Sequence, residues 1–302
     1  MRIIYLGTPE FAVPPLRALL DHGYDVAAVV TAPDKPGGRQ GWQESAVKKF
    51  ALSRGLLVLQ PERLKSPDFL DALRSLQADL QVVVAFRMLP EAVWNMPPLG
   101  TLNLHASLLP KYRGAAPINW AIIRGEKETG LSTFRLKHEI DTGDLLDQIR
   151  LPIGPDETAG ELHDRMMTAG ADLVLRTVQA LGRGEARPQA QRDEAATHAP
   201  KIFTDTCCIQ FDQPVQQVHD FVRGLSPHPG AWTELDGKTL KILRTALQVP
   251  ASPPLQAPGS FLSDGKHWLL IACADGWLQV LDLQMEGKKR MSVRDFLNGY
   301  RL

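Results

Sequence analysis

The chain has 302 residues, which exceeds the usual length of one domain and predicts two domains. Hydrophobic residues make up 44% of it, yet no apolar run approaches the ~20 residues of a membrane-spanning helix, so we expect no membrane partner. The formal net charge is zero, which excludes a protein that coats nucleic acid through its overall charge but leaves room for a local basic cluster.

The first part of the chain alternates strand-like and helix-like segments. Strands are expected at residues 2–6, 25–31, 80–86 and 101–105, and helices at residues 11–22, 45–54, 67–76 and 158–181. The run Leu-Gln-Val-Val-Val-Ala-Phe at 80–86 has the nearly continuous apolar composition of a parallel strand buried on both faces. This alternation predicts an open, mostly parallel α/β sheet.

The second part of the chain shows a different pattern. Residues 183–200 are rich in Gly, Arg, Gln and Ala, and we interpret them as a linker between domains at 1–182 and 201–302. Short strand-like runs follow at residues 232–235, 239–244, 268–272 and 277–283, with one helix expected before them at 215–223. Gly, Asp and Pro turns separate these runs, a pattern that predicts a small β-barrel.

An amide and an imidazole stand two residues apart at the end of the fourth expected strand. Because alternate side chains of a strand share a face, Asn103 and His105 should point together while Leu102 and Leu104 point into the core. Ligands of open α/β sheets bind beyond the carboxyl ends of the strands. Asp141 adds a carboxylate from a turn. Transfer of a one-carbon acyl group to an amine needs such groups, as donors to the oxyanion and as an acceptor of the amine proton.

Each of these residues alone is more often a turn or capping residue. The complete run over 101–118, Thr-Leu-Asn-Leu-His-Ala-Ser-Leu-Leu-Pro-Lys-Tyr-Arg-Gly-Ala-Ala-Pro-Ile, is followed at 136–144 by Leu-Lys-His-Glu-Ile-Asp-Thr-Gly-Asp. Together they resemble formyltransferases that use 10-formyltetrahydrofolate, most closely those that act on methionyl-tRNA. The resemblance extends over nearly the whole chain, through residues 7–11, 33–39 and 287–291.

The resemblance implies a Rossmann-like catalytic domain followed by an OB-like barrel. It makes Asn103, His105 and Asp141 the catalytic groups: Asn103 and a protonated His105 would bind the oxyanion, and Asp141 would assist proton transfer from the amine. The co-substrate would be 10-formyltetrahydrofolate, without a metal. Its expected contacts are the loop Ser107, Leu108, Leu109 and Pro110 and an apolar slot near Phe86, Met88 and Leu89.

The implied acceptor is initiator methionyl-tRNA. The residues expected to contact it are Arg39, Trp42, Lys201, Lys288, Lys289 and Arg290. The chain departs from the family after Arg39, because Gln40-Gly41-Trp42-Gln43-Glu44 stands where glycine and further basic residues are usual. Fewer charges predict fewer phosphate contacts. Trp42 would either stack on a base or pack beneath the loop.

Other activities remain open at this stage. A sugar-nucleotide N-formyltransferase would share the three catalytic groups, and a 10-formyltetrahydrofolate hydrolase would replace the amine by water. The loop around Arg39 and the basic cluster at 288–290 favour tRNA. A dinucleotide-dependent oxidoreductase is disfavoured, because Gly7-Thr8-Pro9 lacks the remaining glycines of that fingerprint. A tRNA-binding module would not need all three catalytic groups. The three cysteines show no disulfide or metal pattern, so we expect a cytoplasmic protein. We also expect a monomer.

Overall fold

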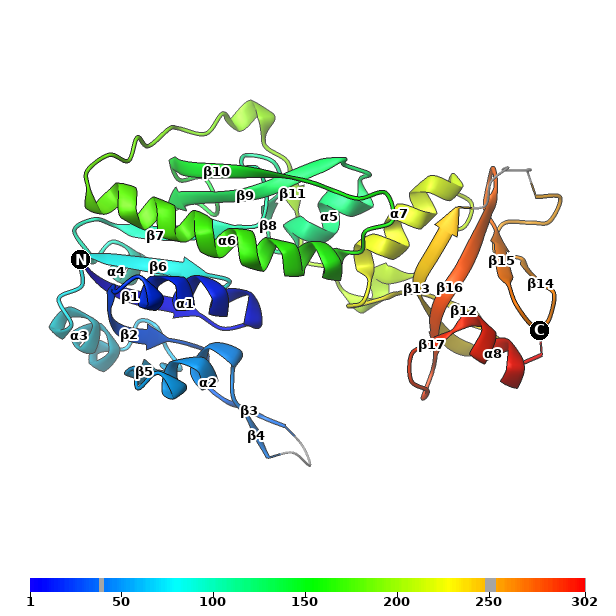
Figure 1. Cartoon of the computed structure of the whole chain (residues 1–302), viewed down its shortest axis with the longest axis horizontal. Coiled ribbons are helices and arrows are strands. Elements are labelled where there is room, and N and C mark those ends of the chain that lie inside the picture. The colour runs from blue at the N-terminus through cyan, green and yellow to red at the C-terminus, as the bar shows by residue number, and fades with distance from the viewer. Residues whose placement is uncertain (38–40, 248–253, 302) are drawn as a thin grey trace. The chain divides into compact units, whose positions relative to one another are not determined.

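The computed structural model describes residues 1–37, 41–247 and 254–301, which form two compact units (Figure 1). The first unit comprises Met1–Arg113, Gly130–Leu151 and Asp164–His198. The second comprises Gly114–Thr129, Pro152–His163 and Ala199–Leu302. Each unit therefore gathers segments from distant parts of the chain. None of the helices in the described ranges is long and apolar enough to cross a bilayer.

A seven-stranded sheet forms the centre of the first unit, in the order β10-β9-β7-β6-β1-β2-β5. Its strands are β1 (Arg2–Gly7), β2 (Asp25–Val30), β5 (Val58–Leu59), β6 (Leu80–Val84), β7 (Thr101–His105), β9 (Glu128–Arg135) and β10 (Leu145–Pro152). The five strands from β5 to β7 are parallel neighbours, whereas β9 runs antiparallel to β7. All five residues of β6 are buried, as its apolar run predicted.

Helices cover this sheet. They are α1 (Val13–Asp21), α2 (Ala46–Ser53), α3 (Pro67–Ser75), α4 (Glu91–Trp94) and the long α6 (Ala159–Gly182). Local sequence explains two of the starts: Ser45 caps α2 by accepting a hydrogen bond from the Lys48 amide, and Pro67 occupies the first turn of α3, where no amide donor is needed. Gly170 lets α6 approach β7 closely, because an added Cβ would lie 2.9 Å from Cδ2 of Leu104.

A second, antiparallel sheet has the order β12-β13-β16-β15-β14, with β17 paired to β16. Its strands are β12 (Ala231–Leu235), β13 (Lys238–Leu247), β14 (Phe261–Ser263), β15 (Leu269–Ala272), β16 (Trp277–Met285) and β17 (Met291–Ser292). Register shifts between β13 and β16 at Ile242/Arg244 and Arg244/Thr245 add curvature. The predicted fold class is therefore confirmed: a mostly parallel Rossmann-like sheet is followed by a curved half-barrel of the OB-like kind (Figure 1).

Three helices belong to the second unit, α5 (Pro117–Ile123), α7 (Val215–Leu225) and α8 (Val293–Gly299). Helices α5 and α7 pack closely at Gly224, where an added Cβ would lie 2.6 Å from Cγ1 of Ile123. The side-chain amide of Asn119 also donates a hydrogen bond of 2.7 Å to the Gly224 carbonyl. The contact therefore requires a residue without a side chain at position 224.

Several short elements were not predicted from the sequence. Among them are the strands β3 (Lys35–Pro36), β4 (Trp42–Gln43), β8 (Arg113–Gly114) and β11 (His198–Ala199), and the 3-10 turns Asp193–Ala195 and Thr204–Cys207. Strands β3 and β4 pair antiparallel, so two short paired strands flank the loop expected around Arg39. Strands β8 and β11 pair with each other, so the end of the expected linker is fixed by backbone hydrogen bonds.

Candidate active site

Strand β7 presents Asn103 and His105 on one face. Leu104 lies against α6, and the pleat of the strand therefore directs Asn103 and His105 to the opposite face. Asn103 is half-buried, and no hydrogen bond joins its side-chain amide to any described residue. The Asn103 amide is thus available as a donor to a bound molecule.

The ring of His105 is held between a backbone carbonyl and a carboxylate. Its Nε2 lies 2.8 Å from the carbonyl oxygen of Tyr112, and because a carbonyl only accepts, Nε2 carries the hydrogen. Nδ1 lies 3.7 Å from Oδ2 of Asp141, and both side chains are about nine-tenths buried. This separation is longer than a hydrogen bond, so the carboxylate does not engage Nδ1, which carries a hydrogen only when the ring is protonated.

The turn that carries Asp141 has an unusual backbone conformation and a close backbone contact. Asp141 has a φ of +57°, in the left-handed region that aspartate tolerates better than most residues. At Gly143 an added Cβ would lie 1.6 Å from the carbonyl oxygen of Arg135. A hydrogen bond of 3.0 Å from the Arg135 amide to the Asp144 carbonyl closes the turn. Close backbone contact therefore fixes where the Asp141 carboxylate lies.

The loop predicted to bind folate is held by Ser132 of β9. The Ser132 hydroxyl donates to the Ser107 carbonyl at 2.6 Å and accepts from the Leu109 amide at 3.0 Å. Gln148 of β10 adds hydrogen bonds from its side-chain amide to Ser132 Oγ and to the Leu109 carbonyl. Ser107 and Leu109 are buried, whereas Leu108 and Pro110 are half-buried. The latter two are the loop residues that a bound molecule could touch with their side chains.

The three residues of the expected pterin slot differ in burial. Leu89 is buried in the core cluster around β6, and Phe86 packs against that cluster. Met88 is 72% exposed. The Arg87 guanidinium lies 5.6 Å from the centroid of the Phe86 ring and donates to the Glu62 carbonyl. Only Phe86 combines a partly buried apolar surface with an accessible edge.

Arg39 lies outside the described residues, but both ends of its loop are anchored. The Lys48 ammonium forms ion pairs with Asp34 and, at 2.9 Å, with Glu44, so it joins the start of the loop to its end. Hydrogen bonds from Lys48 and then from Gln60 hold the pKa of Asp34 below its usual value. Trp42 is 70% exposed, which leaves its indole free to stack on a ligand. The acidic Glu44, unusual for the family, thus has a partner in Lys48.

The three charged side chains of the basic cluster at 288–290 differ in whether they form ion pairs. Arg290 forms an ion pair with Asp282. Lys288 and Lys289 are exposed, and neither forms an ion pair with a described residue. Lys201 is also exposed, with its ammonium 5.2 Å from the centroid of the Phe203 ring. The two lysines of the cluster are therefore the better placed for a phosphate.

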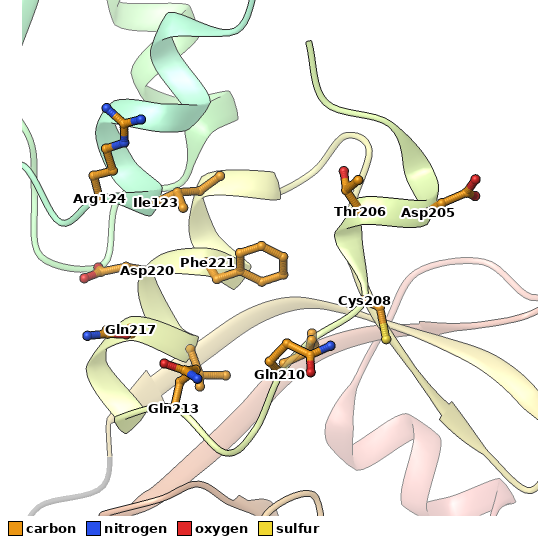
Figure 2. Close-up of a pocket in the computed structure, with 12 residues that line it drawn as sticks. Ile123, Arg124, Asp205, Thr206, Cys208, Gln210, Gln213, Gln217, Asp220 and Phe221 are labelled. Carbon is orange, nitrogen blue, oxygen red and sulfur yellow. The ribbon is translucent and has the colours of Figure 1, made fainter. Parts of the chain in front are cut away.

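A pocket of about 620 Å³ lies in the second unit (Figure 2). Figure 2 shows Phe221 and Gln217 on the α7 side and Cys208 across from them. The residues that line this pocket include none of those predicted for catalysis, folate or tRNA.

Sequence reasoning missed four residues that hold this site. They are Arg113, Ser132, Gln148 and Gln191. Arg113 belongs to the motif run after His105 and could have been suspected there, whereas the others lie in segments without a recognisable pattern. Their roles depend on contacts between residues far apart in the chain.

Comparison with known proteins identifies the family. A profile described as formyl transferase matches residues 1–178, and one described as formyl transferase, C-terminal domain, matches residues 201–301. A methionyl-tRNA formyltransferase of Parabacteroides distasonis is 55% identical over 312 aligned positions, which cover 100% of this chain and 96% of the relative.

Solved structures share the fold at low sequence identity. The sugar 3N-formyl transferase WlaRD is 19% identical with a TM-score of 0.69, covering 96% of this chain and 99% of its own. A methionyl-tRNA formyltransferase from Clostridium thermocellum is 16% identical with a TM-score of 0.58, covering 83% of this chain and 95% of its own. With both profiles matched and a full-length relative at 55% identity, the chain belongs to the formyl transferase family.

Proposed function

We propose that this protein transfers the formyl group of 10-formyltetrahydrofolate to the amino group of the methionyl moiety of initiator methionyl-tRNA. The observation that carries the proposal is the 55% identity, over the full chain, to a methionyl-tRNA formyltransferase. The three catalytic candidates support it, because Asn103 offers an amide without a described partner beside the buried His105–Asp141 pair. A structural neighbour solved with 5-N-formyl-tetrahydrofolate supports a folate co-substrate.

The proposed roles are those that the resemblance implies, and the placement of Asn103 beside the His105–Asp141 pair supports them. In the reaction a bond forms between the methionyl nitrogen and the formyl carbon, and the bond from that carbon to the folate nitrogen breaks. Asn103 donates a hydrogen bond to the oxygen as it gains negative charge, and His105 protonated at Nδ1 donates a second. Asp141 accepts the proton that the amine loses, and this proton is returned to the departing folate nitrogen. Ser107 to Pro110 and Phe86 would hold the folate, with Met88 and Leu89 beside it.

We also propose different roles for the two domains and the linker. Residues 1–182 would carry the chemistry, 183–200 would join the domains, and 201–302 would bind tRNA. Trp42 and Arg39 would meet the acceptor end, while Lys201 and Lys288 to Arg290 would face the phosphate backbone. The protein would act in the cytoplasm as a monomer.

The acceptor can be tested directly. Purified protein with 10-formyltetrahydrofolate is offered charged initiator methionyl-tRNA, a UDP-amino sugar or no acceptor, and formyl transfer and formate release are followed. We expect formylmethionyl-tRNA as the product. Transfer to the sugar alone, or release of formate alone at the same rate with and without acceptor, would contradict the proposal and favour the sugar enzyme or the hydrolase.

The basic cluster gives a second expected result. Replacing Lys288 and Lys289 together by alanine should weaken tRNA binding and reduce the slope of log affinity against log salt by about 0.7 to 0.9 for each phosphate that is no longer neutralised. Lys266→Ala, at an exposed turn of the same unit, serves as the control. Arg39→Ala applies the same measurement to the loop. An unchanged slope in the double variant would exclude these lysines from the phosphate contacts.

A further inference from the structure

The side-chain amide of Gln191 connects two parts of the active site. Its Nε2 donates hydrogen bonds of 2.8 Å to the carbonyl of Asp141 and 2.8 Å to that of Gly143. Its Oε1 accepts hydrogen bonds from the Arg113 guanidinium, at 3.1 Å from Nε and 2.8 Å from Nη2. The reverse orientation of the amide would oppose donors to donors and oxygen to oxygen, so these contacts fix its orientation.

These hydrogen bonds act where the Asp141 turn needs support. The left-handed conformation of Asp141 costs free energy, and its carbonyl is one of the two that Gln191 binds. Two other contacts of the turn, from the Thr142 hydroxyl to the Glu139 carbonyl and from Lys137 to Asp144, are exposed to solvent. Gln191 is half-buried, and its amide binds two backbone carbonyls of the turn. It therefore restrains the backbone from which the Asp141 carboxylate extends.

The segment that contains Gln191, residues 191–197, also restrains His105. Arg113, which Gln191 binds, is buried and follows Tyr112, whose carbonyl accepts the hydrogen bond from His105 Nε2. Thr197 accepts from the Tyr112 amide at 2.9 Å through its hydroxyl, and its carbonyl accepts from the Arg113 amide at 2.9 Å. Residues 191–197 thus hold the supports of both members of the His105–Asp141 pair.

We propose that Gln191 is a positioning residue for the formyl transfer reaction, setting the separation between His105 Nδ1 and Asp141 Oδ2. The inference rests on the proposed function. It means that residues 183–200, which were expected to be a linker, contain a residue that supports the active site. Gln191 touches no reacting atom, so its removal should alter the rate of the chemical step and leave the affinity for both substrates nearly unchanged.

The test compares three variants in the methionyl-tRNA assay. Gln191→Ala should lower kcat by about 10- to 100-fold, the effect of misplacing a catalytic group by about 1 Å, with both KM values within about twofold of wild type. Gln191→Glu keeps the acceptor for Arg113 but loses the donor to Asp141 and Gly143. If support of the turn is what matters, Gln191→Glu should lower kcat as much as Gln191→Ala does. Gln189→Ala removes an exposed amide two residues away, where only the backbone pairs with Leu145, and should match wild type.

Thermal denaturation of each variant separates positioning from folding. A folded Gln191→Ala or Gln191→Glu with wild-type kcat would overturn the inference, as would a rise in KM that accounts for the whole loss of activity. Retention of kcat by the glutamate variant alone would show that Gln191 merely anchors Arg113, which also overturns it. A wild-type protein that formylates no methionyl-tRNA would instead refute the proposed function.

Discussion

Replacing Asn103 with alanine is expected to lower kcat for formyl transfer by about 100- to 1000-fold, the usual cost of losing one donor to an oxyanion. The structure makes this variant unusually informative, because the Asn103 amide is half-buried and forms no hydrogen bond with a described residue. Its loss should leave the folded protein nearly as stable as before. The rate of formylation in quenched reactions with charged tRNA gives kcat, and thermal denaturation gives the stability of the folded protein.

The expected result for His105→Ala has two parts. The rate should fall by a comparable factor, and stability should also fall by about 1 to 3 kcal/mol because the Tyr112 carbonyl loses its buried donor.

The control for Asn103→Ala is Asn95→Ala, which removes an exposed asparagine after α4 and should have no effect on kcat. Turnover of Asn103→Ala near that of Asn95→Ala would remove Asn103 from the catalytic groups.

Replacing Gly143 with alanine is expected to be the most damaging single-methyl change near the site. The new Cβ would lie 1.6 Å from the Arg135 carbonyl oxygen and 3.1 Å from Cδ2 of Phe134. The first neighbour is backbone at the end of β9 and cannot turn aside, so the turn must move and carry Asp141 with it. We expect unfolding free energy to fall by about 3 kcal/mol and kcat to fall by about 100-fold.

The measurement for Gly143→Ala is urea denaturation alongside the formylation assay. Gly299→Ala in α8 is the matched control, because its added Cβ would meet no atom within 4 Å. That change should alter neither stability nor rate by more than a small amount. Wild-type stability and rate for Gly143→Ala would mean that the turn can relax at no cost and does not fix Asp141.

How much was predictable from sequence depends on the range of the contacts involved. The apolar strand β6 and the alternation of Asn103 and His105 with leucines follow from local periodicity, and the observed strands agree with them. Strand β10 was not predicted because it is only partly buried, and its sequence alternates weakly. Gln191 gave no signal either, since its partners lie 50 and 78 positions away in the chain. The catalytic groups are local motifs, but their supports depend on tertiary contacts.

The loop around Arg39 shows the same division. Its departure from the family pattern at Glu44 was visible in the sequence and was interpreted only as a loss of positive charge. The structure gives Glu44 a partner, because Lys48 binds it together with Asp34 at the other end of the loop. A carboxylate at this position therefore fixes the base of the loop, an effect that a count of charges does not predict.

The close packing of α5 against α7 has a consequence during synthesis. Asn119 and Gly224, which meet in the folded chain, are separated by 105 positions. At about 5 to 20 residues per second, the ribosome needs roughly 5 to 20 seconds to deliver the second partner after the first. The side of helix α5 that carries Ile123, which packs against Gly224 and the core of the second unit, stays uncovered through that interval. This apolar side chain is thus open to chaperones and to aggregation until α7 emerges.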